Sequence, residues 1–266
     1  MLNASAGPIL PRIIAFRTAF ARRQAATVVE VAGGFAVLDA EFAASYDHNK
    51  LILARLDDPA EAIAVADHVL GGAGLTHRLI VVNDDETGEA GAARFIDAGY
   101  HQETSVFMRH TGAAADRPAD PGVRVEAVDW SVLVPVDRHA WREQLPTASE
   151  QAIEQLVMRR GARLRGADEV CFLAVRDGTG EVVAHAELYL DRTHRTAQIE
   201  QVMTRPEHER RGFARAIMAE GLRRALAAGC DLVFLEADAN DWPRHFYARL
   251  GYEPVGRTHS FTRAPG

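Results

Sequence analysis

The sequence has little lysine, little cysteine and no long apolar run. Lys50 is the only lysine among 30 basic residues, and Cys171 and Cys230 are the only cysteines. Two cysteines exclude a disulfide framework and suit a reducing compartment. No apolar run approaches the roughly 18–20 residues that span a bilayer. The net charge of −7 argues against a nucleic-acid partner, because binding to phosphates needs a basic surface.

The composition is that of an ordinary globular protein, with 47% hydrophobic and 25% charged residues in a chain of 266. At roughly 100–200 residues per domain, this length predicts one large domain or two ordinary ones. Taken together, these features predict a soluble, cytoplasmic protein that has no membrane partner.

Residues 1–29 contain four arginines and no acidic residue, which is also typical of a targeting peptide. The alternative is a first amphipathic helix, because Ile13, Phe16 and Phe20 share one helical face. No small-residue cleavage site follows an apolar core of secretory length. We therefore favour the helix.

A stretch rich in proline, glycine and alanine, TGAAADRPADPG, interrupts the chain near its middle. It lacks apolar periodicity and is the best linker candidate. We expect a first domain at 1–112, a linker at 113–121 and a second domain at 122–266.

The second half alternates between strand-like and helix-like segments. We expect strands at 123–128, 170–175, 182–190, 196–204, 232–237 and 252–262, and helices at 131–144, 149–165, 212–228 and 242–250. This order predicts an α/β fold with a mixed sheet flanked by helices.

The first half repeats this pattern in a poorer form. We expect strands at 28–31, 35–38, 51–56, 78–82 and 100–108, and helices at 59–70 and 91–98. A shift of 152 positions places Gly99-Tyr100 on Gly251-Tyr252. Such a spacing suggests two copies of one fold rather than a solenoid.

The segment TRPEHERRGFAR, which ends at Arg215, is the most informative stretch for chemistry. A strand should end near Thr204 and a helix should begin near Gly212. Free N–H groups at a helix start, with a glycine and nearby arginines, form a cradle for a pyrophosphate. A solvated basic turn that caps a helix fits this segment equally well.

With the downstream segment NDWPRHFYARLGY, this stretch resembles the GCN5-related N-acetyltransferase (GNAT) family over about residues 123–266. The family's Q/R-x-x-G-x-G/A signature is matched at Gly212 and Ala214, whereas Glu209 stands where the family has Gln or Arg. The second landmark, Y-x-x-x-G-F/Y, is met by Tyr247, Gly251 and Tyr252. The resemblance implies two tandem GNAT-like domains, the N-terminal one incomplete.

The resemblance implies an acetyl-CoA-dependent N-acetyltransferase that moves the acetyl group directly to a primary amine. It also implies that Tyr247 protonates the leaving thiolate, and a positioned phenol is suited to that role. The alternative for Tyr247 is a core aromatic residue on a short helix. The resemblance implies cofactor contacts from Val202, Met203, Thr204, Arg210, Arg211, Gly212, Phe213, Ala214, Arg215 and Asn240.

The attacking amine must lose a proton, because a free alkylamine is mostly protonated at pH 7. Glu200 is the best candidate base, since carboxylates on this strand can face the acceptor channel; a solvated outward residue is the alternative. His185 and Glu187 share one strand face, which is weak evidence for a base or a metal site. No cluster has convincing metal-ligand spacing, so we expect no metal. Cys171, within an apolar run, is interpreted as a core residue.

In the family the acceptor pocket is built from the first two helices, which here include Arg138, His139, Trp141 and Glu143. We expect a small-molecule amine as the acceptor. A peptide acceptor, a longer acyl-CoA donor and a non-catalytic acyl-CoA-binding module remain alternatives, and Glu209 favours the last.

The first half has the features of a disabled copy. Phe95 replaces Tyr247, and the acidic segment 57–61 replaces the phosphate loop. This half either closes over the acceptor pocket, mediates formation of a homodimer or stabilises its partner domain.

Overall fold

The computed structural model describes residues 8–264. Its α-helices are α1 (Ile9–Gln24), α2 (Pro59–Gly72), α3 (Asp85–Asp97), α4 (Val134–Gln144), α5 (Glu150–Met158), α6 (Phe213–Ala227) and α7 (Pro243–Arg249). Short 3-10 helices are η1 (Ala40–Phe42), η2 (Tyr46–His48), η3 (Trp130–Leu133), η4 (Arg159–Arg165) and η5 (Pro206–His208). The strands are β1 (Thr27–Val31), β2 (Gly34–Leu38), β3 (Lys50–Leu53), β4 (Arg78–Val82), β5 (His101–His110), β6 (Glu126–Val128), β7 (Glu169–Arg176), β8 (Val182–Asp191), β9 (Thr196–Thr204), β10 (Leu232–Asp238) and β11 (Tyr252–Arg263).

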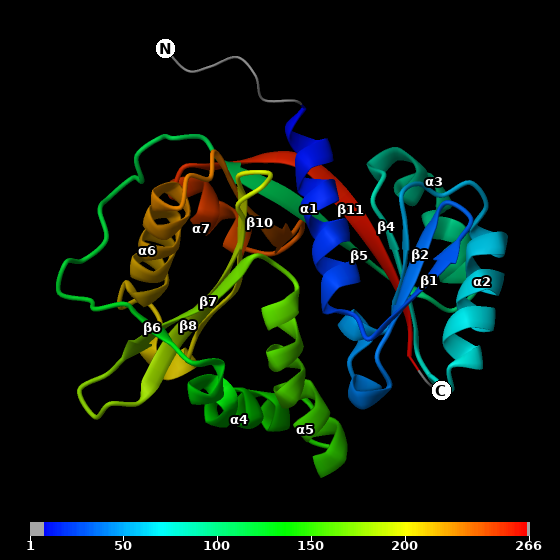
Figure 1. The fold of residues 1–266 in the computed structure, drawn as a ribbon, viewed down its shortest axis with the longest axis horizontal. Coiled ribbons are helices and arrows are strands. Elements are labelled where there is room, and N and C mark those ends of the chain that lie inside the picture. The colour runs from blue at the N-terminus through cyan, green and yellow to red at the C-terminus, as the bar shows by residue number, and fades with distance from the viewer. Residues whose placement is uncertain (1–7, 265–266) are drawn as a thin grey trace.

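All these strands form one mixed sheet in the order β1-β2-β3-β4-β11-β5-β10-β9-β8-β7-β6 (Figure 1). The two halves of the chain exchange their last strands within it. β5, from the first half, lies between β10 and β11, and β11 lies between β4 and β5. The β5–β11 ladder runs from the pair Tyr252–His110 to the pair Thr262–His101. The halves therefore share one continuous sheet.

The same pairing pattern occurs on each side of this exchange. β3 pairs antiparallel with β2 and parallel with β4, as β9 does with β8 and β10. Phe95 of α3 stacks on Phe261 at a centroid distance of 4.0 Å. Asp58 caps α2, accepting a hydrogen bond from Ala60 N at 2.9 Å, and places a carboxylate where a phosphate loop would need N–H donors.

Helices cover both faces of the sheet (Figure 1). α2, α3, α6 and α7 pack on one face, over the apolar clusters of each half. α1 lies across the middle of the other face, where Phe16 meets Phe234 edge to face at 5.4 Å and Phe20 stacks on Tyr189 at 4.4 Å. The predicted first amphipathic helix is thus confirmed, and it contacts strands of the second half.

The predicted α/β fold with a mixed sheet flanked by helices is confirmed, but some predicted segments differ in extent, and the helix predicted at 131–144 divides into η3 and α4. The strand predicted at 123–128 is limited to Glu126–Val128, and the one at 51–56 ends at Leu53. α3 begins six residues before the predicted 91–98, because Asp84 caps it by accepting from Thr87 N at 2.9 Å. The helix predicted at 149–165 divides into α5 and η4. The division at 113–121 stays a prediction.

Candidate active site

β9 and β10 separate at the middle of the sheet. They pair at only three positions, from Leu232–Thr196 to Phe234–Gln198. Beyond them, β9 has a bulge: Gln201 has φ of 53°, and the register against β8 shifts between His185 and Glu187. The edge of β9 that faces β10 is therefore unpaired from residue 199 onward, and its backbone groups are open to a ligand.

A cavity of about 570 Å³ lies at this gap, beside α6 and α7. We call it the cofactor cleft. Nine predicted residues line it: Val202, Met203, Thr204, Arg210, Gly212, Phe213, Ala214, Arg215 and Tyr247. Two of the predicted cofactor contacts do not line it. Arg211 instead contacts His208 Nδ1 at 2.9 Å, and Asn240 is exposed after β10. All these cofactor assignments stay predictions.

The loop between η5 and α6 has the backbone of an anion-binding cradle. Arg210 and Gly212 both have left-handed φ values, of 60° and 85°. Gly212 is the N-cap of α6 and makes no side-chain cap, so the first N–H groups of the helix have no side-chain acceptor. Alternating backbone conformations that turn N–H groups inward suit an anion such as a diphosphate.

Two side chains of this loop differ from the expected arrangement. Arg215 is buried, and its Nη1 donates to Asp116 Oδ1 at 2.7 Å and to Arg117 O at 2.9 Å. The positive charge of Arg215 is therefore already paired with Asp116, which lies in the predicted linker. Glu209 is exposed, beside Arg210 at the mouth of the cleft. The sequence could not show the first contact, because Asp116 is 99 residues away.

Tyr247 is largely buried in the cofactor cleft, with 9% of its surface exposed. Burial raises the pKa of its hydroxyl to about 12, and the nearby charge of Glu200 adds to the increase. The phenol is therefore protonated at neutral pH. Among residues 8–264 the hydroxyl has no hydrogen-bond partner, which leaves its proton available to a ligand.

Glu200 lies on the opposite face of the sheet, under α1. It is half-buried and accepts a hydrogen bond from Gln198 Nε2. Burial raises the pKa of its carboxyl group, and the positive charge of Arg17 opposes that increase. It is therefore not the fully solvated residue of the alternative interpretation. Its negative charge also contributes to the raised pKa of Tyr247, although the two side chains line different cavities.

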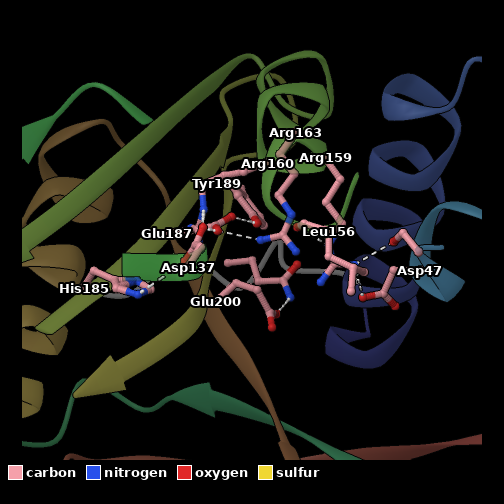
Figure 2. A network of polar contacts seen from close by, with 12 residues as sticks. Asp47, Asp137, Leu156, Arg159, Arg160, Arg163, His185, Glu187, Tyr189 and Glu200 are labelled. Atoms are coloured by element: carbon pink, nitrogen blue, oxygen red, sulfur yellow. Dashed lines mark hydrogen bonds and ion pairs between the residues drawn. The ribbon is translucent and has the colours of Figure 1, made fainter. Parts of the chain in front are cut away.

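A buried ionic network supports the acceptor side of the sheet (Figure 2). Glu187 accepts hydrogen bonds from Arg160, Arg163 and Tyr189, and Arg160 also donates to Asp137 at 2.6 and 2.7 Å. The two arginines lower the pKa of Glu187 to about 2, despite its complete burial. The network ties η4 to β8 and α4. The sequence did not single out these arginines, because charged residues within a predicted helix usually lie on its solvated face.

The remaining candidate residues named from the sequence are buried, packed against the core or paired with other side chains. Burial, with the charge of Arg160, lowers the pKa of His185 to about 4, so it is neutral. Cys171 packs against the apolar cluster of the second half, and burial raises its pKa. Of the four predicted acceptor residues, Trp141 faces the same cavity as Glu200, whereas His139 and Glu143 line another and Arg138 pairs with Glu154 at 2.8 Å.

Metal-binding clusters and membrane-spanning helices are both absent from the described part of the chain. Between residues 8 and 264, no group of three His, Cys, Asp or Glu side chains is placed to hold a metal ion. In the same range, no helix has the length and apolar character needed to cross a membrane.

Solved structures share this fold. A conserved protein of unknown function from Staphylococcus epidermidis superimposes with a TM-score of 0.68 at 15% identity, covering 90% of this chain and 93% of that one. A GCN5-related N-acetyltransferase from Kribbella flavida gives a TM-score of 0.62 at 19% identity, over 98% of this chain and 97% of that one. The fold is thus that of a GNAT protein along nearly the whole chain.

Sequence comparison points to the same class. Residues 130–252, a little under half of the chain, match the model of the Acetyltransferase (GNAT) family. The uncharacterized N-acetyltransferase CgeE of Bacillus subtilis (strain 168) is 30% identical over 74 residues. That match covers 28% of this chain and 29% of CgeE, so it spans less than a third of the curated relative.

Proposed function

We propose that this protein is an acetyl-CoA-dependent N-acetyltransferase that transfers the acetyl group directly to a primary amine of a small molecule. One observation carries the proposal. Tyr247, a protonated phenol, and Glu200, a carboxyl group of raised pKa, face the two sides of the gap between β9 and β10. An acid and a base so placed can act on the two sides of one transferred group.

The residues of the cofactor cleft fit acetyl-CoA, whose thioester supplies the activated acetyl group. The N–H groups after Gly212 and the side chain of Arg210 would hold its diphosphate. The unpaired edge of β9 at Val202–Thr204 would bind the pantetheine arm and polarise the carbonyl group.

The reaction then needs two proton transfers. Glu200, directly or through water, accepts the proton of the amine that attacks the thioester carbonyl. As the C–N bond forms, the C–S bond breaks and the electron pair stays on sulfur. Tyr247 donates its hydroxyl proton to that thiolate. Glu200 then releases the proton it has gained to solvent, and Tyr247 takes one up, so atoms and charge balance over a turnover.

A non-catalytic acyl-CoA-binding module is the second candidate. Two observations favour it: Glu209 stands at the mouth of the cleft, and Arg215 is already paired with Asp116. Both features weaken the attraction of the loop for a diphosphate. The available proton of Tyr247 favours the enzyme.

Calorimetric titration of acetyl-CoA into the purified protein, followed by turnover on a panel of amines, tests the proposal. We expect one binding site, weakened with strong salt dependence by the double change Arg210→Ala and Arg211→Ala. Binding without turnover on any amine would support the module. Absence of binding would remove both candidates. Turnover of peptides but not of free amines would replace the small-molecule acceptor by a protein.

A further inference from the structure

A cavity of about 630 Å³ lies between the two halves, on the face of the sheet that carries Glu200. We call it the inter-half chamber. The first half supplies much of it, from α1, η2, β4 and β5, and the second half supplies β9, β10, β11, α5 and η4. Its volume suits a small ligand.

The floor of the chamber is a polar stretch of sheet. A sheet face covered by helices is normally apolar, and the opposite face of the same strands follows this rule: Phe261 of β11 is fully buried there. On the chamber side, alternate positions of β5, β9 and β11 are hydrophilic. They include Glu103, Ser105, Gln198, Glu200, Ser260 and Thr262. Such a floor favours water or a polar ligand over a packed core.

The chamber is lined by four cationic side chains and four carboxylates, but the cations are paired unevenly among them. Arg17 is paired with Glu236, and Asp47 contacts Lys50 at 3.4 Å and Arg159 at 3.2 Å. The remaining lining cation, Arg163, is held by Glu187. Two lining carboxylates, Glu103 and Glu200, have no cation within 4.0 Å anywhere in residues 8–264. These two carboxylates therefore have no ion-pair partner of their own and are available to a cationic ligand.

A buried group on the chamber wall also lacks a partner. His48 of η2 is 2% exposed and lines the chamber, and its Nε2 has no hydrogen bond within the described chain. Its Nδ1 lies 3.0 Å from Ser45 Oγ, which already accepts from Arg159 at 2.8 Å. The hydroxyl proton of Ser45 is thus free to bond Nδ1, which leaves the imidazole proton on Nε2. Buried polar groups are normally satisfied, so a ligand or bound water is expected here.

We propose that the acceptor is a small hydrophilic amine with two cationic centres, bound in the inter-half chamber. Its reacting nitrogen lies at Glu200, and its second ammonium group pairs with Glu103 of the first half. This inference rests on the proposed function and adds the class of substrate and the role of the first half: Glu103 is a specificity-determining residue.

The test compares three amines of equal chain length at saturating acetyl-CoA: 1,4-diaminobutane, 1-aminobutane and 4-aminobutanoate. Release of the free thiol measures turnover. We expect the diamine to have the highest kcat/KM of the three. Glu103→Gln should raise the KM for the diamine roughly fivefold, as expected for losing one partly solvated ion pair, without changing kcat. The kcat/KM for the monoamine, which has no second ammonium group, should stay the same. Glu61→Gln, which removes an exposed carboxylate of α2 outside the chamber, is the matched control.

A second measurement separates this inference from the proposed function. It is the calorimetric titration of 1,4-diaminobutane into the complex of protein and CoA. If the diamine binds, Glu103→Gln weakens this binding and no turnover occurs, the chamber is a diamine site and acetyl transfer is refuted. If the enzyme turns over the monoamine and the diamine equally well, or if Glu103→Gln does not change turnover of the diamine, the proposal of a dicationic acceptor is wrong. The proposed acetyltransferase activity would still stand. Neither binding nor turnover would refute both.

Discussion

Arg215, in the first turn of α6, donates a hydrogen bond from Nη1 to Oδ1 of Asp116 at 2.7 Å. Arg215 is buried, whereas 43% of the Asp116 side chain is exposed. The segment that joins the two halves is thereby attached to the loop that we propose as the phosphate cradle. A bound diphosphate and the Asp116 carboxylate would compete for one guanidinium group.

Asp116→Asn should therefore strengthen the binding of acetyl-CoA. The amide keeps a hydrogen-bond acceptor for Arg215 and removes the negative charge, so the Kd should fall about three- to tenfold at low salt. Calorimetry at two ionic strengths measures this change, which should shrink at high salt. Asp120→Asn, a change of charge in the same segment, is the control, because the Asp120 side chain accepts a hydrogen bond from the neighbouring Gly122 N at 2.8 Å and pairs with no arginine in the described structure. Weaker binding by Asp116→Asn would show that the carboxylate orders the cleft.

Tyr247→Phe should lower kcat by about 10–1000-fold and leave the Kd for acetyl-CoA unchanged, because only a proton donor is lost. Steady-state kinetics and calorimetry on the same preparation measure the two constants. Tyr252→Phe is the matched control, since the Tyr252 hydroxyl is buried without a partner in the described structure and its ring lies 6.4 Å from that of Tyr247. Equal activity of both variants would remove Tyr247 from the chemistry.

The elements of the second half could be predicted because their signal is local. In β7, β8 and α6 the apolar positions follow the period of the element that buries them, and the predicted ranges agree with the structure within one or two residues. The exchange of β5 and β11 has no such signal. It depends on pairing His110 with Tyr252 across 142 positions, and either strand would satisfy the same local pattern within its own half.

In the candidate site, too, local features could be predicted and contacts between distant segments could not. Tyr247 and the loop at Gly212 belong to contiguous motifs, so the sequence located them. The partners that define their surroundings come from distant segments: Asp116 reaches Arg215, and Arg17 and Glu103 approach the face of Glu200 from the first half. Phe95 and the acidic cap of α2 suggested a disabled copy. They did not reveal that this copy provides walls for a cavity of the other half.

Glu200→Gln should lower activity and raise stability at neutral pH. A carboxyl group whose folded-state pKa is raised favours the folded state below its unfolded pKa and loses that contribution as pH rises through the folded value. Ionised Glu200 therefore costs stability near pH 7, and the glutamine does not. The Tm of the variant should exceed that of the natural protein at pH 7–8 and match it near pH 4. The acidic limb of the kcat/KM profile, where Glu200 becomes protonated, should disappear. A lower Tm at pH 7 would contradict the burial argument.

Glu187→Gln should have the opposite effect on stability. Glu187 is fully buried between Arg160 and Arg163, which lower its pKa to about 2 from an ordinary 4.5. Its ionised form therefore stabilises the fold above its unfolded pKa, and that contribution is lost as pH falls through about 2. Removing the charge leaves two buried guanidinium groups without their shared partner, so we expect a loss of about 3–5 kcal/mol of unfolding free energy at pH 7.

Denaturant unfolding at pH 7 and pH 3 measures this loss, which should be smaller at the lower pH. Glu220→Gln is the matched control, because Glu220 also pairs with two arginines, Arg223 and Arg224, and its pKa is also about 2. Its side chain is 19% exposed and that of Arg223 is 64% exposed, so solvent screens these charges and the loss should cost about 1 kcal/mol or less. Equal costs for the two substitutions would mean that burial adds nothing to the ion pairs of Glu187. The network would then not be what holds η4 against the acceptor side of the sheet.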